Sequence, residues 1–239
     1  MKLNKLRTIM AATLASSFCM SAAQAATWDI KINNLTHGNH FTPLFLQAHN
    51  ASTNLFELGE AAAADVELMA ECGDNSLLVT SAGGGTFVDN PAGGPLAPGA
   101  NTTTTINTAV SNETHLTVVA MILPTNDAFM GLEAQEIPTA AGTYTYYVNG
   151  YDAGTEANDE ILNASGSCDS TTLGMPGAPG GDADSGATGV AGNDTNTNIH
   201  VHRGALGDAT ANAAGSSDLV STIHRWQNPV AEVIVTVTP

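Results

Sequence analysis

The chain has 239 residues, of which 23 are acidic and 6 are basic, so its formal net charge is −17 at pH 7. A chain this acidic lacks the basic surface that nucleic acids require, which excludes nucleic-acid binding. With 43% hydrophobic residues, it has enough apolar side chains for one well-buried domain.

The first 25 residues have the three parts of an export signal. Three basic side chains are followed by an apolar run from Ile9 to Met20 and by the cleavage motif Ala23-Gln24-Ala25. The apolar run is too short for a membrane-spanning helix. We therefore expect a signal peptide over residues 1–25 and one exported domain over residues 26–239. Because cleavage removes three of the 6 basic residues and none of the 23 acidic ones, the net charge would change from −17 to −20.

Two cysteines, Cys72 and Cys168, remain after this cleavage. An even number of cysteines in an exported protein predicts a disulfide, and two cysteines allow one pairing. Closing so long a loop would stabilise the fold by about 3–5 kcal/mol in the chain-entropy model. Two free thiols are the alternative, and neither cysteine lies in a recognisable nucleophile motif.

The first half of the exported chain is predicted to form short strands and one helix. Apolar and polar side chains alternate from Trp28 to Asn33, which is the period of a half-buried strand. The alanine-rich segment from about Ala61 to Glu71, ended by Gly73, is predicted to be the only helix. The predicted strands of this half are residues 28–33, 43–48, 77–80 and 86–89.

The second half is richer in β-branched residues. Leu116 to Leu123 is almost continuously apolar, which predicts a strand buried on both faces. The other predicted strands are residues 102–110, 143–148 and 230–237. Many short strands separated by turns predict an all-β fold, an antiparallel β-sandwich.

A long connection rich in Gly, Ala, Asp, Asn and Ser extends over residues 157–196. It is far longer than the connections that compact domains usually contain, so we interpret it as a functional or mobile loop.

Two of the predicted strands end in acidic turns. The strand ending at Leu123 is followed by Asp127, and the strand ending at Val148 is followed by Asp152 and Glu156. If the segment between them crosses the sheet once, both turns lie at the same end of the domain. Ca²⁺ takes about 6–8 oxygen ligands and tolerates irregular geometry, so this end is a candidate calcium site. The spacing does not fit an EF-hand, and two further acids, Asp159 and Glu160, are candidates by position alone.

Three histidines offer an alternative metal site. His200 and His202 lie on the same face of a predicted strand, and His224 lies in a second segment. Three histidines are typical of catalytic zinc sites, so an exported zinc-dependent hydrolase is the alternative function. A serine hydrolase is disfavoured because the chain has no Gly-x-Ser-x-Gly motif. Paired carboxylates leave glycosidase chemistry open, although aromatic residues for a sugar groove are scarce.

Several segments carry a family resemblance. They are Phe41-Thr42-Pro43, residues 55–59, Pro124-Thr125-Asn126-Asp127-Ala128-Phe129-Met130-Gly131, Tyr151-Asp152-Ala153-Gly154-Thr155-Glu156 and residues 226–231. In these segments the sequence resembles the bacterial branch of the spondin N-terminal domain, the module found in F-spondin. The resemblance covers nearly all of the exported chain.

This resemblance implies a C2-like antiparallel β-sandwich whose end loops bind Ca²⁺. Matched by motif, Asp127 takes the place of the first-loop aspartate and Asp152 that of the aspartate opening Asp-Ala-Gly-Thr. Glu156 takes the place of the closing acid, where an aspartate is expected. The implied function is that of a non-enzymatic adhesion or interaction module, secreted or at the cell surface, whose partner is a protein or a polysaccharide.

Overall fold

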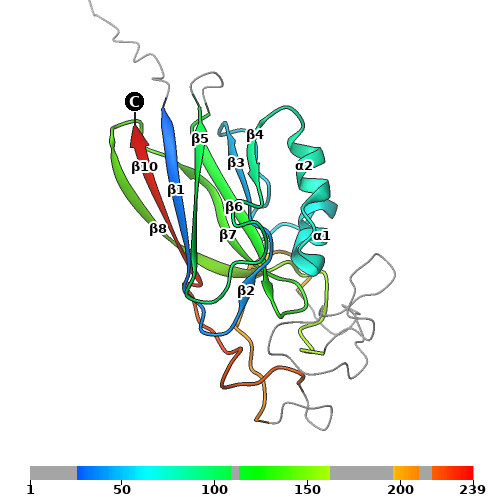
Figure 1. Ribbon diagram of the computed structural model, residues 1–239. Helices are drawn as coiled ribbons and strands as arrows, with labels where there is room; N and C mark the ends of the chain where they lie inside the picture. The colour runs from blue at the N-terminus through cyan, green and yellow to red at the C-terminus, as the bar shows by residue number, and fades with distance from the viewer. Residues whose placement is uncertain (1–25, 109–112, 162–195, 210–216, 239) are drawn as a thin grey trace, which may run out of the picture.

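The computed structural model describes residues 26–108, 113–161, 196–209 and 217–238 (Figure 1). Within these residues the chain forms strands and two helices. In chain order they are β1 Thr27–Asn34, β2 His40–Phe41, β3 Phe45–His49, α1 Ala64–Cys72, α2 Ser76–Ala82, β4 Thr86–Asp89, β5 Asn101–Asn107, β6 His115–Leu123, β7 Ala128–Glu136, β8 Gly142–Asp152, β9 His200–Val201 and β10 Ala231–Thr238.

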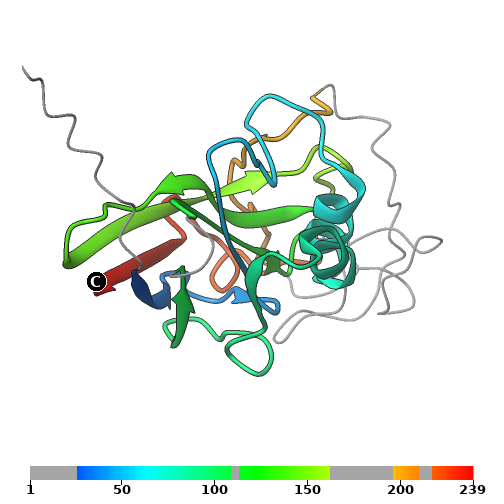
Figure 2. The same cartoon turned by 90° about the horizontal axis from the view of Figure 1, so that it is seen from above.

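The strands pair antiparallel in one 10-stranded sheet with the order β4-β3-β6-β7-β8-β10-β1-β5. Short β2 pairs with β6, and short β9 pairs with β8. The sheet curves so far that its two outer strands, β4 and β5, lie next to each other, as the two views show (Figures 1 and 2). The all-β antiparallel fold predicted from the sequence is confirmed in this nearly closed barrel or sandwich.

Strand β6 has buried side chains on both of its faces, as its apolar sequence predicted. Leu116, Val118, Ala120 and Ile122 enter the larger core cluster inside the curved sheet. Val119 points to the opposite face, into a second cluster that contains residues of both helices. The second cluster fixes α1 against β6 and β7, and α2 against α1 and β4.

The helices differ from the sequence prediction. Helix α1 agrees with it and ends at Gly73, whose left-handed φ of 63° suits a glycine cap. The prediction of a strand over residues 77–80 was wrong, because these residues form α2. Periodicity cannot distinguish a short apolar strand from a short helix, and burial of Leu78 in the second cluster favours the helix. The chain therefore has two helices in the described residues rather than one.

Strand β7 was not predicted, yet it determines where the acidic turns lie. It runs antiparallel to β6 on one side and to β8 on the other. The turn after β6 and the turn after β8 therefore lie at the same end of the sheet, as one return pass requires. Gly131 is needed in β7, because a Cβ there would lie 2.6 Å from the Cζ atom of Phe56.

Three predictions fall on residues outside the described part of the chain. They are the signal peptide of residues 1–25, the cysteine partner Cys168, and residues 162–195 of the long loop. The predicted Cys72–Cys168 disulfide and the export signal stay predictions. Neither described helix has the length and apolar character needed to cross a membrane.

Candidate functional site

The turn between β6 and β7 places Asp127 at the end of the sheet. The Thr125 hydroxyl donates to the Ile122 carbonyl at 2.6 Å and accepts the Ala128 N–H at 3.1 Å, so one side chain closes the turn. Asp127 follows two residues later and has no exposed surface. Its backbone carbonyl accepts the N–H of Ala153, which ties this turn to the loop after β8.

The two carboxylate oxygens of Asp127 have different surroundings. Oδ2 accepts the backbone N–H groups of Thr155 at 2.8 Å and Glu156 at 3.1 Å. Oδ1 is buried and has no hydrogen-bond partner. Burial and the negative charge of Asp152 raise the pKa of Asp127 to about 7, although the two N–H donors act in the opposite direction. Asp127 is thus a buried carboxylate with one unpaired oxygen beside a like charge, which is an unfavourable arrangement.

Asp152 is the last residue of β8 and lies beside Ala128 in the register of β7 and β8. Its Oδ1 accepts the Gly154 N–H at 2.9 Å, and its Oδ2 accepts the Asn158 amide at 2.6 Å. Gly154 has a φ of 73°, and a Cβ there would meet the backbone of Thr197 at 2.6 Å. The glycine of Asp-Ala-Gly-Thr is therefore required by both conformation and space.

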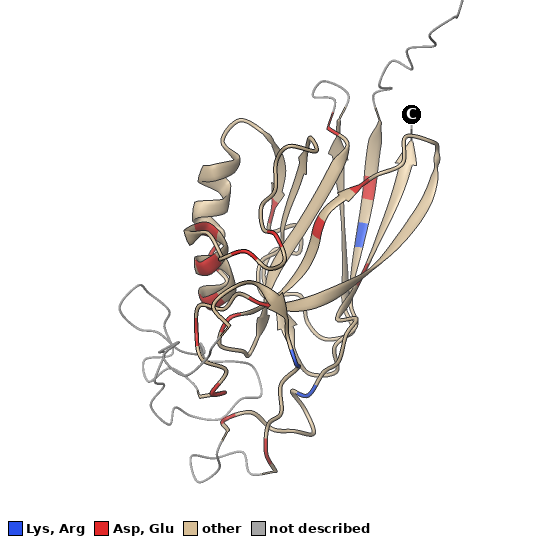
Figure 3. Cartoon of the chain, turned by 180° about the vertical axis from the view of Figure 1, so that it is seen from behind, with Lys and Arg blue, Asp and Glu red and all other residues tan. Residues whose placement is uncertain are grey.

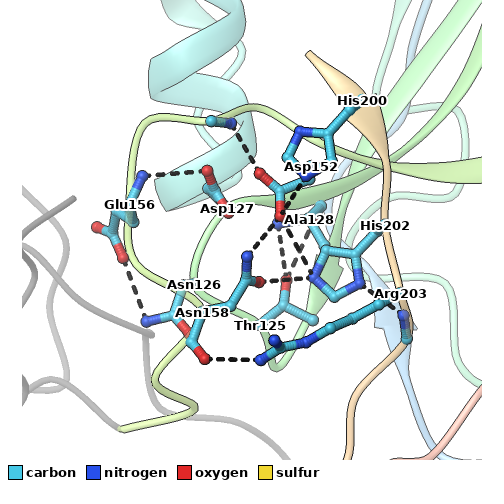
Figure 4. A network of polar contacts seen from close by, with 12 residues as sticks. Thr125, Asn126, Asp127, Ala128, Asp152, Glu156, Asn158, His200, His202 and Arg203 are labelled. Carbon is cyan, nitrogen blue, oxygen red and sulfur yellow. Dashed lines mark hydrogen bonds and ion pairs between the residues drawn. The ribbon is translucent and has the colours of Figure 1, made fainter. Parts of the chain in front are cut away.

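Glu156 is buried in the same loop and is linked to the first turn by an amide (Figure 4). The Asn126 side chain donates to Glu156 Oε2 at 3.4 Å and to Asp159 Oδ1 at 3.0 Å. The side-chain oxygen of Asn126, Oδ1, accepts the Glu160 N–H at 3.1 Å. Asn126 thus brings Glu156 and Asp159 close to Asp127, and all three predicted calcium ligands lie in one network.

Glu160 has a separate role, although it follows closely in the sequence. Its Oε1 accepts the Leu206 N–H at 2.6 Å, and its Oε2 accepts the Gly207 N–H at 2.9 Å and the Ser217 hydroxyl at 2.7 Å. Both oxygens are therefore used to hold a neighbouring loop. By position Glu160 was a candidate ligand, but its contacts are structural.

One acidic residue of this region was not identified from the sequence. Glu71, in the last turn of α1, is 6% exposed, and its carboxylate lies beside the Thr155 hydroxyl. Burial raises the pKa of Glu71, the Thr155 hydroxyl lowers it, and the charge of Glu67 adds to the rise. Figure 3 shows acidic residues gathered on α1 and on the loops next to it. The sequence places two acids one turn apart in this helix but does not say which of them faces inward.

The histidines approach the same aspartate. His200 Nε2 lies 3.7 Å and His202 Nε2 lies 3.9 Å from Asp152 Oδ2. Nδ1 of His202 accepts the Gly204 N–H at 2.9 Å, so its proton lies on Nε2, which donates to Asn158 Oδ1 at 2.8 Å. Burial lowers the pKa of His202 to about 4, which keeps the ring neutral. With both nitrogens engaged, His202 has no lone pair to offer a metal ion.

Among the residues that the structure describes, no three His, Cys, Asp or Glu side chains are arranged to hold a metal ion by themselves. This statement covers His200, His202 and His224, whose Nδ1 accepts the Val220 N–H at 3.0 Å. It also covers the three predicted calcium ligands. The two sets differ in chemistry, however, because carboxylate oxygens that accept one hydrogen bond keep further lone pairs, whereas His202 keeps none.

A comparison with protein families supports the sequence resemblance. The family model described as Spondin_N matches residues 31–164, which is more than half of the chain and includes both acidic turns. No curated protein matches the chain.

Proposed function

The chain belongs to the Spondin_N family, and on this premise we propose that it is a calcium-binding, non-enzymatic interaction module. The family is extracellular and generally non-enzymatic. In the proposed function the ion is held by Asp127 and Asp152, with Glu156 as a third carboxylate, at the end of the sheet where the two loops meet. The partner is an extracellular or cell-surface protein or polysaccharide.

One observation supports the proposal most strongly, namely the unpaired Oδ1 of Asp127. Buried polar oxygens normally have a partner, and an unpaired one costs about 1–3 kcal/mol. The neighbouring Asp152 adds a like charge. A divalent cation would provide Oδ1 with a partner and offset both charges, and hard oxygen donors are the ligands that Ca²⁺ prefers.

The present hydrogen bonds explain why the three carboxylates do not yet converge. Asp127 Oδ2 and both oxygens of Asp152 accept N–H groups, and Glu156 accepts the Asn126 amide. We expect Glu156 to turn from Asn126 toward the ion when calcium binds. When bound, calcium would neutralise the clustered carboxylates, and the chain's own residues would fix the β6–β7 turn to the loop after β8.

The ordered loops are the part of the domain that we propose to meet the partner. One ion would hold the residues of two separate turns together. The surface that these turns form would therefore have the arrangement that the partner recognises only when calcium is bound. Binding to the partner is therefore expected to require calcium, as ligand binding stabilises the form that it prefers.

The proposal is tested by thermal melts of the exported chain in EGTA and in millimolar CaCl₂. At a free calcium concentration of about 100 Kd, binding stabilises the fold by about 2.7 kcal/mol, or about 5–10 °C in Tm. Asp152→Ala is expected to lose this calcium-dependent increase. Glu136→Ala is the matched control, because Glu136 is an exposed acid at the opposite end of β7 from Asp127. Equal Tm values of the wild type in EGTA and CaCl₂ would sink the proposal.

A further inference from the structure

Glu71 occupies a position that is unfavourable for a carboxylate in three ways. It lies in the last turn of α1, where the helix dipole disfavours negative charge and no basic residue is present. Glu67, of the same charge, lies one turn earlier at i−4. The side chain is also buried, at 6% exposure. A carboxylate that is unfavourable in its helix for several reasons at once indicates a role other than stabilising that helix.

The surroundings of Glu71 connect it with Asp127. The Thr155 hydroxyl donates to Asp127 Oδ2 at 3.3 Å and lies beside the Glu71 carboxylate. The charge of Glu71 also adds to the rise in the pKa of Asp127. No Lys or Arg in the described part of the chain forms an ion pair with either residue; the contacts of ion-pair length there are those of the His200 and His202 rings with Asp152. Glu71 therefore adds negative charge to a buried group of acids that already contains an unpaired oxygen.

The position of α1 allows it to supply this carboxylate. The helix packs on β6 and β7, the two strands joined by the turn that carries Asp127. Its end at Cys72 and Gly73 lies against Thr42, because a Cβ on Gly73 would meet the Thr42 side chain at 2.4 Å. The last turn of α1 is thus held near the loops by packing that does not depend on a metal ion.

We propose that Glu71 is a further carboxylate ligand of the calcium site, supplied by the helix rather than by the loops. This inference rests on the proposed calcium binding. It implies that calcium joins three parts of the domain, namely the β6–β7 turn, the loop after β8 and α1. Occupation of the site would then stabilise the end of α1 together with the loops.

The test is calorimetric titration of the exported chain with CaCl₂, comparing the wild type with Glu71→Gln and Glu67→Gln. Loss of one charged ligand is expected to weaken calcium binding about tenfold in Glu71→Gln. Glu67→Gln, one turn away and exposed to solvent, is expected to bind as the wild type does. If the wild type binds calcium and Glu71→Gln binds it equally well, the role of Glu71 is overturned while the proposed function stands. If the wild type binds no calcium, both fail.

A second measurement separates ligation from a purely structural role. In EGTA, Glu71→Gln is expected to melt at the same or a higher temperature than the wild type, because a buried like charge has been removed. In CaCl₂, Glu71→Gln is expected to melt at a lower temperature than the wild type. Glu71→Asp, which keeps the charge, should restore part of the calcium-dependent increase in Tm. A loss of Tm in Glu71→Gln that is equal in EGTA and CaCl₂ would show a structural role and overturn the proposal.

Discussion

Two buried acids in neighbouring loops, Asp127 and Glu160, have opposite hydrogen-bonding states. Both carboxylates are buried. Asp127 follows β6 and Glu160 follows β8, and the two strands finish at the same end of the sheet. Glu160 receives donors on both oxygens, from Leu206, Gly207 and Ser217. Asp127 receives donors on Oδ2 alone, and Oδ1 has none. Burial therefore does not identify a metal ligand, whereas the number of satisfied oxygens distinguishes a structural carboxylate from a candidate ligand.

The largest expected effect comes from Glu160→Gln. An amide can replace only part of the accepting capacity of the carboxylate, and it leaves at least one buried N–H or O–H donor unpaired. We expect a loss of about 3 kcal/mol in the free energy of unfolding, of the same size in EGTA and in CaCl₂. Urea unfolding followed by circular dichroism measures it. A loss that disappears in CaCl₂ would place Glu160 in the metal site and end the contrast with Asp127.

Asp127→Asn is expected to act in the opposite direction when calcium is removed. Its amide oxygen can still accept the Thr155 and Glu156 N–H groups, while the like charge beside Asp152 is lost. In EGTA at pH 8 we expect the free energy of unfolding to rise by about 1–2 kcal/mol. In CaCl₂ the variant should lack the calcium-dependent gain of the wild type. A variant that is less stable than the wild type under both conditions contradicts this account.

The free energy of unfolding should also depend on pH in a way that tests the role of Asp127. The pKa of Asp127 is raised from 3.8 to about 7, so between these values the folded state keeps a proton that the unfolded state has lost. The contribution of Asp127 to stability therefore falls as pH rises through this window, by up to about 1.4 kcal/mol per pH unit. The pKa of His202 is lowered from 6.5 to about 4, so its contribution rises with pH in the overlapping window.

In the wild type these two contributions offset each other. Asp127→Asn removes only the falling one, so its stability in EGTA should rise more steeply with pH than that of the wild type. Unfolding measured at several pH values between about 3.5 and 7.5 gives both slopes, because this range contains both pKa values. Parallel pH profiles for the two proteins would show that Asp127 does not titrate in this range.

Much of the fold could be predicted from residue patterns. Alternation identified β1, and a continuous apolar run identified β6 as a strand buried on both faces. Strand β7 was not predicted because Gly131 and the charged residues near its end interrupt the pattern of apolar residues. Helix α2 was predicted as a strand because a short apolar run fits either structure. Both errors concern segments whose structure is decided by packing against distant residues.

The site was predictable in part for a related reason. The proximity of Asp127 and Asp152 followed from two acidic turns at one end of a sheet. The difference between Asp127 and Glu160 did not, because the donors to Glu160 come from residues 206–217, far along the chain. Glu71 was missed because local sequence does not reveal which acid of α1 faces the loops. Hydrogen-bond partners that are remote in sequence therefore decide the roles of individual carboxylates.

The most direct test of the account is a crystal structure of the exported chain grown in millimolar CaCl₂. We expect an ion bound within about 2.3–2.6 Å of Asp127 Oδ1, the oxygen that lacks a partner, with Asp152 also in its coordination shell. Both oxygens of Glu160 should keep their present donors. A structure in which the loop end holds no ion at this calcium concentration, and Asp127 Oδ1 contacts protein atoms alone, would contradict the account.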